Sequence, residues 1–182
     1  MGSPISRLTA LRILAGAFLA ASATGAPAQQ QEESTNQVDA KTAWSVFEDK
    51  NPRECWAVSS PTKTVNTRDG RVVAVRRGDI LLMTFYRPEA GVEGQVTFTG
   101  GYPFAKGSTV NLTVGDKKFE LLTEGEWAWP ASTADDAKVI AALKGGTDAV
   151  LTARSKRGTQ TKDTFSLIGY TAAVEEAAKR CK

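Results

Sequence analysis

Few residues in this chain could do chemistry, because its 182 residues include no histidine and only two cysteines. Without an imidazole the chain cannot form a Ser-His-Asp or Cys-His catalytic group, a histidine-ligated metal site or a histidine pH switch. Two cysteines are too few for a four-cysteine zinc site or an iron–sulfur site. We therefore expect neither a bound metal nor a cofactor.

Glu124 and Glu126 are the candidate acid–base pair, because Gly125 between them places both carboxylates on one side of a strand end. Such a pair could hydrolyse a glycoside if a cleft held both groups and raised the pKa of one. A cell-wall or glycan hydrolase is therefore one alternative function. Two acids this close in sequence are more often a solvated turn, so we expect no catalytic residues and no enzyme.

Trp127 and Trp129 lie on the same face of an extended segment that Pro130 ends. They could form an aromatic platform for a sugar ring or a partner peptide, and the chain would then be a carbohydrate-binding module. Because tryptophan is mostly buried in folded proteins, we favour packing in the core beside Trp44 and Trp56.

The densest basic cluster consists of Arg154, Lys156 and Arg157, before the turn residue Gly158. A lysine beside Ser155 could activate a nucleophile without histidine, but adjacent strand residues point to opposite faces. The cluster is a candidate loop for binding an anionic lipid, glycan or protein partner. A simple exposed hairpin is the competing interpretation.

A second candidate binding loop contains Gly100 and Gly101, followed by Tyr102, Pro103 and Phe104. The glycines act as hinges, and the proline requires an extended conformation at Tyr102. The competing interpretation is a corner between two strands, which we favour over a binding loop.

The first 28 residues are typical of a signal peptide. Arg7 and Arg12 precede an apolar run at residues 13–23, and Ala26-Pro27-Ala28 forms a signal-peptidase site. Eleven apolar residues are too few to cross about 30 Å of hydrocarbon. We therefore expect an exported mature chain without a transmembrane segment.

Loss of this leader lowers the net charge from +3 to +1, since it removes two arginines and no acidic residue. A nearly neutral chain lacks the concentrated basic face of most nucleic-acid-binding proteins. Residues 29–43 are polar and contain no aromatic residue, which predicts a flexible tail. The folded domain is then expected at residues 44–182.

Short strands separated by turns predict a mostly-β domain. Residues 80–86 are apolar on both faces, as in a central strand, whereas residues 109–114 alternate as in a half-buried strand. Strands spaced by about 8–12 residues favour a sandwich or barrel. The expected strands are residues 44–48, 54–59, 72–76, 80–86, 95–99, 109–114, 118–123, 149–155 and 164–168.

Two short helices are expected after the seventh strand and at the C-terminus. Ser132 or Thr133 caps the first helix, and Gly145-Gly146 ends it. The second helix begins near Thr171, and Cys181 lies on its buried stripe.

Cys55 and Cys181 predict a disulfide, because an even pair of cysteines in an exported protein is most simply bridged. A redox-active thiol would need a nearby second cysteine, as in a Cys-x-x-Cys motif. In the chain-entropy description, closing so long a loop contributes about 5 kcal/mol to the free energy of unfolding.

Several of these segments match a single known pattern. They are Trp44-x-Val46-Phe47, Cys55-Trp56-Ala57, Gly100-Gly101-Tyr102-Pro103-Phe104, Gly125-Glu126-Trp127-Ala128-Trp129, Ser155-x-Arg157-Gly158-Thr159-x-Thr161-x-Asp163-Thr164-Phe165-Ser166-Leu167 and the terminal Cys181. Together they resemble the invasion-associated locus B family of exported alphaproteobacterial proteins. The resemblance runs from about Trp44 to Cys181.

This resemblance implies an immunoglobulin-like β-sandwich and a periplasmic protein, with outer-membrane association or secretion as further options. In pathogenic relatives it implies a contribution to host-cell invasion, notably of red blood cells. It supplies no catalytic residues. We therefore expect a non-enzymatic envelope protein that binds an envelope or host-surface protein or glycan, and no nucleic acid.

Overall fold

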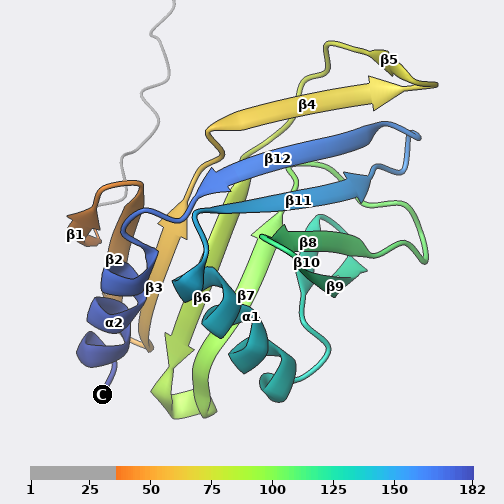
Figure 1. Cartoon of the computed structure of the whole chain (residues 1–182). Coiled ribbons are helices and arrows are strands. Elements are labelled where there is room, and N and C mark those ends of the chain that lie inside the picture. The colour runs from red at the N-terminus through yellow and green to blue at the C-terminus, as the bar shows by residue number, and fades with distance from the viewer. Residues whose placement is uncertain (1–35) are drawn as a thin grey trace, which may run out of the picture. The chain divides into compact units, whose positions relative to one another are not determined.

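The computed structural model describes residues 36–182, so the predicted signal peptide at residues 1–28 lies outside the described residues. The described chain contains twelve strands, two α-helices and one 3-10 helix. Figure 1 shows the strands in two layers, with both helices near one end of the molecule. Within residues 36–182, no helix has the length and apolar character needed to cross a membrane.

All strand pairs are antiparallel, and the strands follow one continuous order, β1-β2-β3-β6-β7-β10-β9-β8-β11-β12-β4-β5. The first layer consists of β1 (Gln37–Lys41), β2 (Trp44–Lys50), β3 (Arg53–Ser59), β6 (Leu81–Arg87), β7 (Val92–Thr99) and β10 (Trp127–Trp129). The second consists of β9 (Lys117–Glu124), β8 (Val110–Val114), β11 (Asp148–Arg154), β12 (Gln160–Ser166), β4 (Lys63–Arg68) and β5 (Arg71–Val72). Strand β9 pairs with β10 and with β8 and thereby joins the layers.

The core lies between the two layers and consists of the alternate side chains that each strand directs inward. Phe98 of β7 meets Phe165 of β12 edge to face, with 6.1 Å between ring centroids. Leu112 and Leu151, which pair between β8 and β11, are fully buried in the same core. Each such side chain contributes about 1.5–3 kcal/mol through burial. The predicted mostly-β sandwich with two short helices, one of them C-terminal, is confirmed.

Helix α1 (Thr133–Gly145) begins and ends as the sequence predicts. The Ser132 hydroxyl accepts a hydrogen bond from the Asp135 N–H at 3.2 Å, which satisfies one free donor of the first turn. Gly146 ends the helix. Helix α1 contacts β7 of the first layer.

Helix α2 (Tyr170–Arg180) covers β2 and β3 with its buried stripe. The ring of Tyr170 meets that of Trp44 edge to face at 4.8 Å, and its hydroxyl lies 3.1 Å from that of Thr84. Burial raises the pKa of Tyr170, because the phenolate would lose its hydration.

The predicted disulfide between Cys55 and Cys181 is confirmed, with 5.8 Å between the two Cα atoms. It ties the end of α2 to β3, so the last residues of the chain are bound to one of its earliest strands. Arg180 adds an ion pair to Glu48 of β2 at 3.2 Å.

Three elements at or near the edges of the sheet differ from the sequence prediction. Strand β1 occupies residues 37–41 within the predicted flexible tail, so the folded domain begins before Trp44. Strand β4 at residues 63–68 was not predicted, and the strand expected at 72–76 is only the two-residue β5. All three are edge or near-edge segments with mostly exposed side chains, where backbone pairing replaces the apolar alternation that identifies a buried strand.

Candidate functional site

The two candidate binding loops predicted from the sequence lie against each other. The Lys156 N–H donates to the carbonyl of Pro103 at 2.9 Å, and the Ala105 N–H donates to the carbonyl of Arg154 at the same distance. The loop at residues 100–108 therefore supports the β11–β12 turn along its backbone.

The β4–β5 hairpin reaches the same end of the molecule, because β4 pairs with β12 and places Thr67 opposite Gln160. Its two-residue turn, Asp69-Gly70, has positive φ angles of 50° and 75°. Such Asp-Gly turns close tight hairpins whose twist matches that of the strands. The Arg68 guanidinium donates to the Thr159 hydroxyl at 2.7 Å and links this hairpin to the β11–β12 turn.

These three segments carry a set of exposed cations that we call the basic end: Arg68, Arg71, Lys106, Arg154, Lys156 and Arg157. Within residues 36–182 none of the six forms an ion pair. Segments 68–71, 100–108 and 154–159 contain a single acidic residue, Asp69. Uncompensated cations on adjoining turns create a positive potential, so the basic end is suited to an anionic ligand.

Tyr102 and Phe104, predicted as candidate binding residues, instead hold the loop in place. Phe104 is buried, with 7% of its surface exposed. Tyr102 is half-buried, and its hydroxyl lies 2.5 Å from that of Thr161. Burial raises the pKa of Tyr102. The corner interpretation is therefore the one that the packing supports.

Arg77 fixes this corner from a third segment. Its guanidinium donates to both carboxylate oxygens of Asp163, at 2.7 and 2.6 Å, and to the carbonyl of Gly100 at 2.8 Å. It also lies over the ring of Tyr102, 5.0 Å from the centroid. Sequence reasoning missed this contact, because Arg77 and Asp163 are 86 residues apart and Arg77 has the local appearance of a turn residue.

Gly101 shows why the corner needs glycine. Its φ is +69°, and the Gly78 N–H donates to its carbonyl at 2.9 Å. A Cβ at Gly101 would lie 2.5 Å from the carbonyl oxygen of Gly78, closer than any real Cβ contact. This close backbone approach holds the start of β6 against the end of β7.

Ser155 and Lys156 do not form a nucleophilic pair. Ser155 is buried, and its hydroxyl accepts a hydrogen bond from the Thr159 N–H at 3.1 Å inside the turn. Lys156 is exposed. One side chain is buried and the other exposed, as expected for neighbouring residues of a strand, which point to opposite faces.

The two tryptophans of β10 do not belong to the core. Trp127 is 46% exposed and Trp129 is half-buried, whereas Ala128 between them is fully buried. Leu122 on β9 stands opposite Trp129 and is 47% exposed. The core interpretation is therefore wrong for Trp127, since β10 directs the small alanine inward and both indoles outward. It is right for Trp44, which is buried.

The paired carboxylates of Glu124 and Glu126 are both exposed in the β9–β10 turn. Neither lines the hollow beside α1 or the one beside the β8–β9 hairpin. The enclosed cleft that a glycoside hydrolase requires is therefore not built around this pair.

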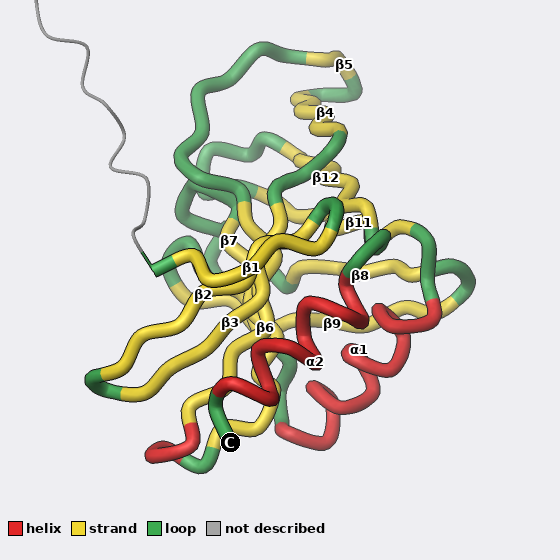
Figure 2. The backbone as a smooth tube through the Cα atoms, turned by 90° about the vertical axis from the view of Figure 1, so that its left-hand side faces the viewer, coloured by secondary structure: helices red, strands yellow, loops and turns green. Residues whose placement is uncertain are grey.

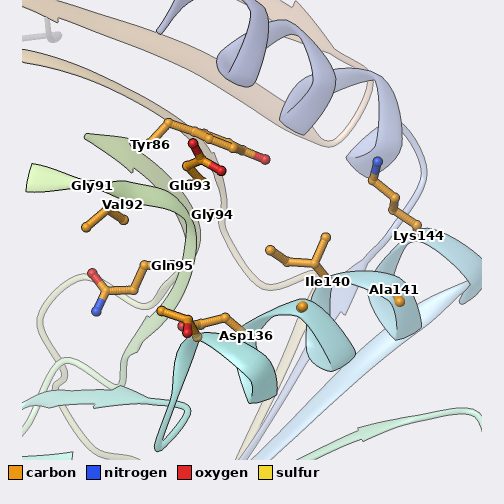
Figure 3. A pocket seen from close by; sticks show the side chains of 12 residues that line it. Tyr86, Gly91, Val92, Glu93, Gly94, Gln95, Asp136, Ile140, Ala141 and Lys144 are labelled. Carbon is orange, nitrogen blue, oxygen red and sulfur yellow. The ribbon is translucent and has the colours of Figure 1, made fainter. Parts of the chain in front are cut away.

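The hollow beside α1 has a volume of about 640 Å³ and lies between α1 and the β6–β7 hairpin, with Asp136, Ile140, Lys144 and Tyr86 around it (Figure 3). Asp136 is buried, and its carboxylate accepts a hydrogen bond from the Val96 N–H at 2.8 Å. Burial raises the pKa of this carboxyl. Because the short β10 leaves this donor of β7 unpaired, we assign Asp136 a structural role.

Among residues 36–182, no group of three or more Asp, Glu, Cys or His side chains is placed to hold a metal ion. The fold and the site thus define a two-layered β-sandwich protein that is closed by one disulfide and has a basic end built from three loops. The chain belongs to the invasion associated locus B (IalB) protein family, whose sequence profile matches residues 41–178.

A solved structure has the same fold. The crystal structure of invasion associated protein B from Bartonella henselae superposes with a TM-score of 0.54, over 78% of this chain and 95% of that chain. The two sequences are 16% identical, so the likeness is one of fold. No curated protein sequence matches this chain significantly.

Proposed function

We propose that this chain is a non-enzymatic protein of the bacterial envelope that binds an anionic partner, at the envelope or on a host surface, through its basic end. The observation that carries this proposal is the convergence of six exposed cations, none in an ion pair within residues 36–182, on three interlocked turns.

Export supports the same proposal. The predicted signal peptide at residues 1–28 directs the chain out of the cytoplasm, and the disulfide suits an oxidising compartment. We place the mature chain in the periplasm, with outer-membrane association or secretion as later steps.

The ordered backbone of the basic end favours ligand binding. Backbone hydrogen bonds connect its loops, and the buried Arg77–Asp163 pair lies directly beneath. Turns whose backbone is already ordered lose little backbone conformational entropy when a ligand binds. Each cation near an anionic surface contributes about 1 kcal/mol to binding, and this contribution decreases as salt screens the charges.

The test measures binding of the chain without its signal peptide to isolated envelope membranes and to inorganic polyphosphate. We expect a variant with Arg154→Ala, Lys156→Ala and Arg157→Ala to bind about 100-fold more weakly, since each lost cation costs about 1 kcal/mol. Its melting temperature should not change, because all three side chains are exposed.

A matched control removes the same charge elsewhere. Lys117, Lys118 and Lys179 are exposed residues of the β8–β9 hairpin and α2. Their triple replacement by alanine should leave binding nearly unchanged. Equal weakening by both triple variants would show that net charge, rather than the basic end, controls binding, and unchanged binding by the first variant would refute the proposal.

A second candidate function is carbohydrate binding, which the exposure of Trp127 favours. Trp129 and Leu122 extend the same outward surface, and a sugar ring stacks on such an aromatic face. None of these three residues belongs to the basic end.

A further inference from the structure

Four consecutive apolar residues lie on the surface between arginines. The segment Arg71-Val72-Val73-Ala74-Val75-Arg76 follows the β4–β5 turn. Val72 is 78% exposed, the highest value among the large apolar side chains of residues 36–182, and Val75 is 37% exposed. Runs of exposed apolar residues are avoided on soluble domains unless a function requires them.

Backbone pairing holds the first three residues of this segment against β4. Val72 of β5 pairs with Thr67 of β4, and the Val73 N–H donates to the carbonyl of Asn66 at 2.9 Å. Strand β5 is the last strand in the sheet order, so its other edge is open. Figures 1 and 2 show β4 and β5 projecting at the end of the second layer, away from both helices.

The exposed valine and Arg154 of the basic end face the same side of the sheet. Arg154 stands opposite Gln160, Gln160 opposite Thr67, and Thr67 opposite Val72 on four successive strands. Directly paired residues in a sheet share a face. This row is directed outward, because the neighbouring residue of β12, Thr161, is buried. Val72 and Arg154 therefore face one common surface, at whose edge the long side chains of Arg68 and Arg71 begin on the opposite side.

We propose that this face docks on an anionic lipid bilayer, with Val72 entering the interfacial region and Arg154 against lipid phosphates. This inference rests on the proposed function, since it names the anionic partner of the basic end. A bilayer surface combines negative headgroups with apolar chains a few ångströms below them, and it matches both properties of the segment.

Other occupants match only one of these properties. A soluble polyanion such as a polysaccharide or polyphosphate neutralises the arginines but leaves Val72 and Val75 in water. A second copy in a twofold contact through this face would bring the positive potential of the basic end against that of its partner, which is repulsive.

The test compares vesicles of phosphatidylcholine alone with vesicles that also contain phosphatidylglycerol, and uses soluble inorganic polyphosphate as the second anion. We expect the chain to bind only the phosphatidylglycerol vesicles. Val72→Ser should weaken this binding about tenfold, because the apolar contribution is lost. The same variant should bind polyphosphate as the unchanged chain does.

Two further variants sharpen the result. Val72→Trp should bind the anionic vesicles more tightly, since tryptophan favours the interface. Ile168→Ser removes another exposed apolar side chain, 59% exposed and just before α2, and should have no effect. Val72 is so exposed that neither change at this position should alter the melting temperature.

The outcomes separate the two proposals. If the chain binds polyphosphate but not the anionic vesicles, or if Val72→Ser leaves vesicle binding unchanged, membrane docking is wrong and the basic end remains an anion site. If the chain binds neither vesicles, polyphosphate nor envelope membranes, both proposals are wrong.

Discussion

Arg77 and Asp163 form a two-point ion pair inside the molecule, with N–O distances of 2.7 and 2.6 Å. Their side chains are 6% and 0% exposed, so water replaces neither partner. Arg77 belongs to the segment that leads into β6, whereas Asp163 lies in β12 of the second layer. The pair therefore connects the loop at residues 100–108, through Arg77, to the buried part of β12.

Breaking this pair should be far more damaging than removing both charges. Asp163→Ala leaves a buried guanidinium without its counter-ion, and we expect the free energy of unfolding to fall by about 3–5 kcal/mol. The double variant Arg77→Met, Asp163→Leu should lose less than either single variant does. Urea unfolding of the three variants measures this, and a loss below about 1 kcal/mol for Asp163→Ala would contradict it.

The disulfide makes a second prediction. Thiol titration of the natively purified, unreduced chain should find no free sulfhydryl, and unfolding with reductant should release two, from Cys55 and Cys181. Replacing both cysteines by alanine should lower the free energy of unfolding by about 2–5 kcal/mol. The melting temperature of that variant should not respond to reductant, which is the internal control. Two free thiols in the native chain would show that the disulfide between Cys55 and Cys181 is absent.

Asp136 predicts a pH-dependent difference between two variants. Burial raises the pKa of its carboxyl, so the folded state loses stability as pH rises through that pKa and the carboxylate forms. Asp136→Asn keeps an oxygen for the Val96 N–H without the charge. Its free energy of unfolding relative to wild type should therefore increase between about pH 3 and pH 7.

Asp136→Ala is the control for the hydrogen bond, since it leaves the buried Val96 N–H unpaired and should be less stable than Asp136→Asn by about 1–3 kcal/mol at every pH. Guanidinium titrations at several pH values measure both variants. A pH-independent difference for Asp136→Asn would mean that this carboxyl titrates normally in the fold.

The tryptophans should separate into structural and exposed residues. Trp44→Ala opens a cavity in the core and should cost about 3–5 kcal/mol, whereas Trp127→Ala should change the free energy of unfolding by less than about 1 kcal/mol. If the aromatic platform binds sugars, added oligosaccharides will quench tryptophan fluorescence, and Trp127→Ala will abolish that quenching. Quenching that persists in this variant would place the sugar elsewhere.

Much of the fold could be predicted because the relevant information is local. The alternation in residues 109–114 matches β8 to within one residue, and Ser132 and Gly146 bound α1 as expected. Caps and alternation depend on neighbours within a few positions, which a sequence displays directly. Strand β4, next to the edge strand β5, escaped prediction although the Asp69-Gly70 turn marks its end, since its side chains give only a weak alternation.

The sequence predicted only part of the candidate site. Arg154, Lys156 and Arg157 are exposed, as expected, and the loop at residues 100–108 lies beside them. Tyr102 and Phe104 of that loop are turned into the structure instead, because the Arg77 guanidinium and the core attract aromatic rings. Burial of this kind depends on distant segments and leaves no local pattern.

The sequence by itself determined the absence of histidine chemistry, the even pair of cysteines and the β-rich alternation, since composition and short-range periodicity do not depend on distant contacts. Only the tertiary structure decided which charges meet. Arg68 and Thr159 are 91 residues apart and become neighbours through the pairing of β4 with β12. Long-range strand pairing also turned Trp127 outward and left Val72 on an open edge, and both result from the packing of the whole sheet.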